Sequence, residues 1–163
     1  MQMLLADSCF NITHDSFIND LDETIQRAEN HKIKYFFAPA SKESEIENLL
    51  HYCKVYEDKV YCSIGIHPHH ASELKPDTIA NLKPHLDSKY VRSIGEVGLD
   101  YFRNFQSPQI QIKCFETFVE LAIQENYPLF LHHREAFNDF YPIVKSAIAV
   151  SYTHLRAHET SKH

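Results

Sequence analysis

The chain has 163 residues, 44% of them hydrophobic, with 16 basic and 22 acidic side chains and a formal net charge of −6. This composition is typical of a globular domain and excludes a disordered or low-complexity chain. The negative charge excludes a surface that is basic throughout, so a polyanionic partner such as DNA would need a local cationic site or a bound metal.

The cysteines and the first residues bear on the cellular compartment. The four cysteines form no Cys-x-x-Cys pair, which argues against disulfides and zinc fingers and favours reduced thiols. Residues 3–6 are the only apolar run near the start, too short for a signal peptide or a membrane span. We therefore expect no membrane partner and a cytoplasmic location, or a nuclear one if the source is eukaryotic.

Short apolar runs alternate along the chain with longer segments of helical period, a pattern that predicts repeated β-strand and α-helix units around a parallel sheet. The five predicted strands are residues 4–6, 34–38, 60–64, 91–94 and 129–131. The four predicted helices between them are residues 17–30, 43–55, 77–86 and 109–125.

Five such units fit two α/β architectures. A complete (β/α)8 TIM barrel needs about 250 residues, so this chain would form about five of the eight units. An open, doubly wound sheet of five strands would be complete at this length. Because no strand is followed by a phosphate-binding Gly-x-Gly segment, we favour a partial barrel of the metal-dependent hydrolase type.

Two predicted strands lead directly into residues that bind metals. Glu96 follows Ile94 and Gly95, and a glycine there permits close approach of the backbone to a ligand. The apolar run 128–131 ends at His132 and His133, of which strand alternation lets only one face the site. Carboxylate and imidazole groups on rigid strands predict a divalent cation, Mg²⁺, Mn²⁺ or Zn²⁺.

Other polar residues near the strand ends are candidates for phosphate binding. His67 and His69 belong to a proline-stiffened loop after the third strand, where they would contact a phosphate or a metal, or simply form an exposed turn. Asp100, Arg103 and Arg134 come just beyond the next strand ends. Guanidinium groups there would clamp phosphate oxygens, although surface salt bridges explain them almost equally well.

Three segments, in this order and spacing, resemble the TatD family of metal-dependent deoxyribonucleases, part of the wider amidohydrolase-like barrel group. They read Gly-Ile-His-Pro-His at 65–69, Gly-Glu-Val-Gly-Leu-Asp at 95–100 and His-His-Arg at 132–134. The resemblance covers nearly all of residues 3–149. It implies a (β/α)8 barrel, one or two divalent cations with Mg²⁺ as the first choice, and hydrolysis of phosphodiester bonds, commonly from DNA ends.

The resemblance also assigns roles to individual residues. Glu96 and His132 match the metal ligands of the family, while His67, His69 and Arg103 match positions near the site. It therefore implies a 3'-5' exonuclease acting on the ends of single-stranded DNA, with RNA as a second substrate. We group Asp100 and Arg134 with the substrate-binding residues.

The chain departs from the family pattern at both ends. Many relatives carry His-x-His after the first strand, where this chain has Cys9 and Asn11, as in the branch that includes the founding TatD nuclease. The family's later metal-binding histidine and the acidic residue that helps activate water have no counterpart before residue 149. We thus assign no catalytic acid within this chain and expect the 163-residue chain to be inactive or nearly so.

The last residues form a separate segment in our interpretation. Residues 150–160 resemble the translation of a sequencing-library transposon adapter, although a natural polar C-terminus is the alternative. We therefore predict that residues 1–149 are the N-terminal part of a TatD-type barrel and that residues 150–163 are a non-native tail. The histidines of this tail are given no role.

Two other functions remain compatible with these residues. A lactonase or amidase of the same barrel group would hydrolyse a small ester or amide and leave DNA intact. A non-catalytic module that binds nucleic acid or protein would be indifferent to divalent metal and to the loss of Glu96.

Overall fold

The computed structural model describes residues 4–159, with side chains described through residue 149. The strands are β1 (Leu5–Asp7), β2 (Ile33–Pro39), β3 (Val60–Ile64), β4 (Val91–Asp100) and β5 (Leu129–Arg134). The α-helices are α1 (Leu21–Asn30), α2 (Ile46–Val55), α3 (Thr78–Leu86), α4 (Pro108–Glu125) and α5 (Phe137–Glu159). Short 3-10 helices are η1 (Asp15–Phe17), η2 (Glu43–Glu45) and η3 (Pro68–Glu73).

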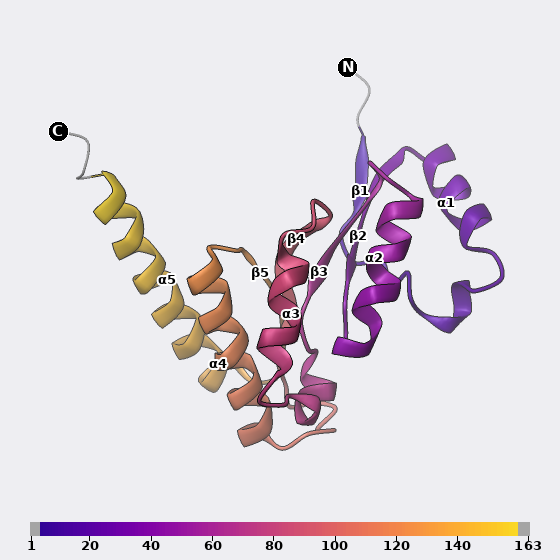
Figure 1. Cartoon of the computed structure of the whole chain (residues 1–163). Helices are drawn as coiled ribbons and strands as arrows, with labels where there is room; N and C mark the ends of the chain where they lie inside the picture. Colours follow the sequence, from indigo (N-terminus) through magenta and orange to yellow (C-terminus); the bar gives the residue numbers. More distant parts are fainter. Residues whose placement is uncertain (1–3, 160–163) are drawn as a thin grey trace.

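The sheet is a parallel half-barrel. Its five strands are hydrogen-bonded in the order β1-β2-β3-β4-β5, and every neighbouring pair is parallel. A doubly wound sheet reverses its strand order at a switch point, whereas a barrel adds each strand beside the last. The sequential order therefore confirms the predicted partial (β/α)8 barrel and excludes the open-sheet alternative. Figure 1 shows the helices lying along one side of the strands.

The main core lies between the sheet and these helices. Phe36 of β2 and Cys62 of β3 are buried there, as is Leu49 of α2. Helix α4 contributes Phe115 and Phe118, which are almost inaccessible to solvent. Burial of a phenylalanine side chain of this kind stabilises the folded state by about 1.5–3 kcal/mol. The face of α4 that carries these phenylalanines is therefore the face that packs on the sheet.

Helix α4 has clear signals at both ends. Pro108 occupies the first helical turn after Ser107, where its missing N–H costs no hydrogen bond. Asn126 ends the helix in the left-handed conformation, with φ of 55°, a position that asparagine tolerates better than most residues. The predicted range 109–125 is confirmed to within one residue.

The interior of the half-barrel carries its own aromatic pair. The rings of Phe37 on β2 and Phe130 on β5 lie 5.2 Å apart between centroids. Strand alternation places Phe130 and His132 on the same side of β5. The aromatic pair therefore lies beneath His132 and supports the carboxyl end of the strand.

Strand β4 extends to Asp100, well beyond the predicted end at residue 94, because it continues to pair with β5 on both sides of a β-bulge. Gly95 pairs with Phe130 and Val97 pairs with Leu131, so Glu96 is the extra, unpaired residue. Its N–H instead donates to the carbonyl oxygen of Ala40, 3.3 Å away, just after β2.

Two glycines allow β4 to approach β5 so closely. Gly95 and Gly98 both have φ of 149°. A Cβ atom on Gly98 would overlap the carbonyl oxygen of His132, and one on Gly95 would overlap that of Phe130. The close approach of the Gly95 backbone to a ligand or metal stays a prediction, and the group that comes close in the structure is the neighbouring strand.

The remaining differences concern the loop after β3 and the end of the chain. The expected loop at residues 67–70 begins the short helix η3.

None of the helices within residues 4–159 has the length and apolar character needed to cross a membrane. Helix α5 extends through residues 150–159 of the predicted tail, and residues 160–163 lie outside the described residues.

Candidate metal centre

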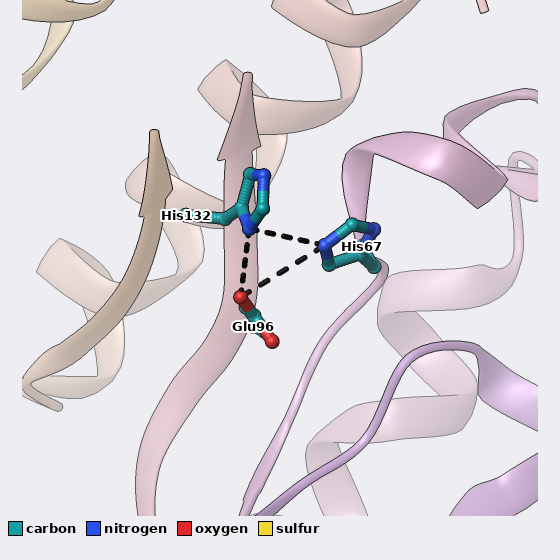
Figure 2. Close-up of side chains that lie close together, drawn as sticks. All are labelled: His67, Glu96 and His132. Carbon is teal, nitrogen blue, oxygen red and sulfur yellow. Dashed lines mark hydrogen bonds and ion pairs between the residues drawn. The ribbon is translucent and has the colours of Figure 1, made fainter. Parts of the chain in front are cut away.

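Three side chains converge near the carboxyl ends of β3 and β5 and at the bulge within β4. His67 caps the start of η3, Glu96 stands at the β4 bulge and His132 belongs to β5. His132 Nδ1 lies 2.9 Å from Glu96 Oε1 and 3.2 Å from His67 Nε2. His67 Nε2 lies 3.8 Å from the same Glu96 oxygen, so the three atoms form a triangle (Figure 2). Within the described residues, this is the one group of three such side chains that could hold a metal ion.

The triangle has the dimensions of a metal site. A triangle with edges of 2.9, 3.2 and 3.8 Å has room for an ion about 2 Å from each corner, which is the usual distance from Zn²⁺ or Mg²⁺ to nitrogen or oxygen ligands. The donor set of imidazole and carboxylate is compatible with Mg²⁺, Mn²⁺ or Zn²⁺. The residues present therefore fit a divalent cation.

His132 lies between two carboxylates. Its Nε2 lies 3.2 Å from Asp100 Oδ2, while its Nδ1 faces Glu96. When Nε2–H donates to Asp100, the Nδ1 lone pair points at the Glu96 carboxylate, and a proton or a cation must lie between them. The hydrogen bond with Glu96 accordingly raises the pKa of His132, against the opposing effect of burial. The carboxylate behind the imidazole is the usual partner of a metal-bound histidine.

The charge of Glu96 is favoured by the same contacts. Burial alone would raise the pKa of its carboxyl group, but the hydrogen bond with His132 and the neighbouring His67 ring hold that pKa below its ordinary value. Glu96 is therefore ionised at neutral pH and available to a cation.

His67 has a different protonation pattern. Its Nδ1 accepts the backbone N–H of His69 at 3.2 Å, which leaves the proton of the neutral ring on Nε2. Burial lowers the pKa of His67 to about 4, so the ring is neutral at pH 7. By distance His67 Nε2 can serve as a third ligand once it gives up this proton, and in this tautomer Nε2–H is a donor toward His132 Nδ1, 3.2 Å away.

Asp100 lies behind the cluster, and its contact with substrate stays a prediction. The residue is only 1% exposed, and its Oδ2 accepts from His69 Nε2 at 2.7 Å as well as from His132. Its Oδ1 accepts the N–H of Arg103 at 2.9 Å. Burial would raise the pKa of Asp100, but these hydrogen bonds lower it to about 2. A buried, ionised carboxylate repels phosphate, so its geometry suits orientation of the two histidines.

The two arginines lie at this end of the barrel but outside the triangle. Arg103 follows Asp100 and is exposed. Arg134 is exposed as well, with its guanidinium carbon 3.7 Å from the centre of the Phe102 ring. A phosphate clamp formed by these side chains stays a prediction.

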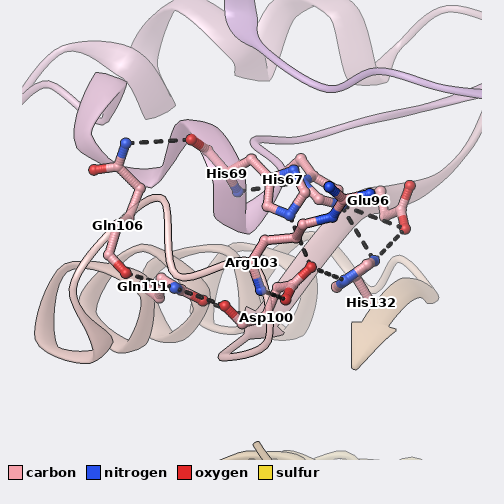
Figure 3. A network of polar contacts seen from close by, with 8 residues as sticks. All are labelled: His67, His69, Glu96, Asp100, Arg103, Gln106, Gln111 and His132. Atoms are coloured by element: carbon pink, nitrogen blue, oxygen red, sulfur yellow. Dashed lines mark hydrogen bonds and ion pairs between the residues drawn. The ribbon is translucent and has the colours of Figure 1, made fainter. Parts of the chain in front are cut away.

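Two glutamines that sequence reasoning missed hold the segment after β4. Gln111, buried in the first turn of α4, accepts the N–H of Asp100 at 2.8 Å and donates to the carbonyl oxygens of Asp100 and Gln106 at 3.0 and 2.8 Å. Gln106 donates to the carbonyl oxygen of His69 at 3.2 Å (Figure 3). The one signal in the sequence was that Gln111 lies on the same face of the predicted helix as the apolar Phe115, which would have indicated its burial.

Cys9 is the residue that the family resemblance matches to the first histidine of many relatives. Its thiol is exposed and does not belong to the triangle. Partial burial, followed by the charges of Glu96 and Asp7, raises the pKa of this thiol. The side chain is thus protonated at neutral pH and adds no ligand to the triangle.

The fold and this cluster define a class: barrel hydrolases with a metal site at the carboxyl ends of parallel strands. The chain belongs to the TatD family, because the family model described as TatD related DNase matches residues 6–162.

Curated relatives and solved structures agree with this assignment. Proteins named 3'-5' ssDNA/RNA exonuclease TatD from Erwinia amylovora and Erwinia tasmaniensis are 34% and 35% identical over 141 residues, 86% of this chain and 54% of each relative. The chain thus spans about half the length of the curated relatives it matches. A TatD family hydrolase from Entamoeba histolytica has the same fold, with a TM-score of 0.78 and 24% identity over 90% of this chain and 55% of that chain. A TatD homologue from Escherichia coli also scores 0.78, with 20% identity over 88% of this chain and 56% of its own.

Proposed function

We propose that this chain is the metal-binding part of a nuclease that hydrolyses phosphodiester bonds of single-stranded DNA or RNA from the 3' end, in the cytoplasm, with Mg²⁺ as the native cation. The observation that carries the proposal is the His132 ring, held by Asp100 so that its other nitrogen faces the ionised Glu96. The Erwinia relatives are named as exonucleases of single-stranded DNA and RNA, which supports the nucleic-acid substrate.

The residues divide the chemistry among themselves. Glu96 and His132 would hold the cation, which when bound polarises a phosphoryl oxygen and lowers the pKa of a water molecule. Asp100 fixes the tautomer and orientation of His132. His67 would donate Nε2–H to a phosphate oxygen, and His69, Arg103 and Arg134 would bind neighbouring phosphates.

We further propose that the 163 residues hydrolyse DNA slowly or not at all by themselves. Glu96 and His132, two of the three corners of the triangle, match the metal ligands of the family. The resemblance assigns another metal-binding histidine and an acidic residue to later strands. Fusing residues 1–149 to the corresponding later part of the Erwinia amylovora relative should therefore produce a far more active nuclease.

Metal binding gives the direct test. Titration calorimetry with Mn²⁺ should show that Glu96→Gln weakens binding at least tenfold, or about 1.4 kcal/mol. Glu57→Gln, which removes a surface carboxylate paired with Lys89, is the matched control and should bind Mn²⁺ normally. Equal affinity in the wild type and Glu96→Gln would refute the metal role.

The nuclease assay tests the substrate. A 5'-labelled single strand, incubated with the fused enzyme and Mg²⁺, should shorten from its 3' end, and a chelator should stop the reaction. Turnover of a lactone or amide with DNA left intact would instead support the hydrolase alternative, and DNA binding indifferent to metal would support a non-catalytic module.

A further inference from the structure

The segment between β4 and α4 presents two exposed aromatic rings beside the candidate metal centre. Phe102 is 53% exposed and Phe105 is 62% exposed, and they stand on either side of Arg103 in the chain. Large apolar side chains gain free energy by burial, so two exposed phenylalanines in one short segment require an explanation.

This segment is held firmly in place. Gln111 and Gln106 tie it to Asp100 and to the carbonyl oxygen of His69, as described above. Tyr101 adds two contacts: its N–H donates to the carbonyl oxygen of Arg134 at 3.0 Å, and its hydroxyl donates to Asp139 at 2.7 Å. The exposure of the rings is therefore a fixed feature of the surface.

Phe105 lies next to the ring system of the centre. Its centroid is 4.8 Å from that of His69, with the rings nearly perpendicular at 80°. The His69 ring in turn lies 4.3 Å from the His67 ring. Phe105 is thus one imidazole away from the His67–Glu96–His132 triangle, and most of its surface remains open to solvent.

Phe102 has a cationic neighbour. The Arg134 guanidinium lies over its ring at 3.7 Å, a cation–π arrangement that fixes the charge at the edge of the site. A free aromatic ring and an arginine–aromatic pair on one short rim are the elements with which proteins bind single-stranded nucleic acids: bases stack on the ring, and the cation contacts the backbone.

We propose that Phe105 is a stacking platform for an unpaired nucleobase of a single-stranded nucleic acid whose adjacent phosphate lies at the His67–Glu96–His132 triangle, with the Arg134–Phe102 pair beside the backbone. This inference rests on the proposed function and deepens it, because it assigns the preference for single strands to a residue. A duplex keeps its base faces stacked inside the helix and cannot offer one to Phe105.

Binding without turnover tests the proposal on the 163-residue chain. Fluorescence anisotropy is measured with Mn²⁺, under which the 163-residue chain is expected to hydrolyse DNA slowly or not at all, using a labelled twelve-nucleotide thymidine strand and a strand of equal length whose sugars carry no bases. Phe105→Ala should weaken binding of the thymidine strand about tenfold, within the range expected for one lost base stack, and leave binding of the abasic strand unchanged.

Two further variants separate stacking from general damage. Phe105→Trp keeps a flat ring and should retain or improve binding of the thymidine strand. Phe137→Ala removes a ring of the same 62% exposure that contacts Tyr141 and His133 rather than His69, and should bind both strands normally. A matching duplex should show no dependence on residue 105.

Several results would overturn the proposal. These are an equal loss of affinity for both strands in Phe105→Ala, unchanged affinity for the thymidine strand, or a wild-type chain that binds neither strand. The failure stays distinct from that of the proposed function, since the Mn²⁺ titration of Glu96→Gln does not depend on any nucleobase.

Discussion

Gln111 holds the backbone at Asp100, beside the candidate metal centre, by hydrogen bonds. Its replacement by methionine should test these bonds with little loss of side-chain volume. Methionine fills nearly the same space but cannot bond to Asp100 or Gln106. The substitution removes the partners of the Asp100 N–H and of the Asp100 and Gln106 carbonyl oxygens. We expect both lower stability and weaker metal binding.

The magnitude follows from the surroundings of the three orphaned groups. A buried polar group left without a partner costs about 1–3 kcal/mol. Gln106 is half-buried, so water can replace the lost contact at its carbonyl oxygen, whereas the two backbone groups of Asp100 are buried at the strand end. The free energy of unfolding should therefore fall by about 3 kcal/mol, a large share of the roughly 5–15 kcal/mol typical of a domain.

Urea unfolding followed by circular dichroism measures this loss. Gln109→Met is the matched control, because Gln109 is exposed in the same helical turn and should change stability by less than about 0.5 kcal/mol. A Gln111→Met chain as stable as the wild type would show that these hydrogen bonds contribute nothing, and would remove the argument that the β4–α4 segment is fixed.

Three further predictions follow from the geometry. Gly98→Ala should lower the free energy of unfolding by about 3 kcal/mol, and with it the urea midpoint, because a Cβ atom would overlap the His132 carbonyl oxygen. An unchanged midpoint would contradict the close approach of β4 to β5. Asp100→Asn should weaken Mn²⁺ binding about tenfold or more in calorimetry, while the exposed Asp87→Asn leaves it unchanged; equal affinities would remove the orienting role of Asp100. An aromatic disulfide reagent should modify only the exposed Cys9 thiol in the native chain and all four thiols in urea, because Cys53, Cys62 and Cys114 are buried. Rapid reaction of a second thiol in the native chain would contradict this burial.

Much of the fold could be predicted because its signals are local. The strand at residues 60–64 and helix α4 depend on apolar spacing and on proline and asparagine at the boundaries, which act within a few residues. The extent of β4 could not be predicted in this way. Gly95 and Gly98 are typical of loops when considered alone, and only the contact with β5 makes them strand residues.

The candidate site was likewise predictable only where its signals are local. Glu96 and His132 could be selected because they end apolar runs and match family segments. The place of Asp100 could not, since its burial depends on His69 and Gln111, which approach from other parts of the chain. A carboxylate beside a strand end has the same local pattern whether it faces substrate or supports a histidine.

The bulge at Glu96 has an evolutionary consequence. Because residue 96 is the unpaired one, deleting its single codon would let β4 and β5 pair without interruption, and would remove one ligand of the candidate centre in the same event. A lineage that no longer needed the metal could therefore discard it in one step and keep the half-barrel, whereas regaining it would require an insertion in the correct register.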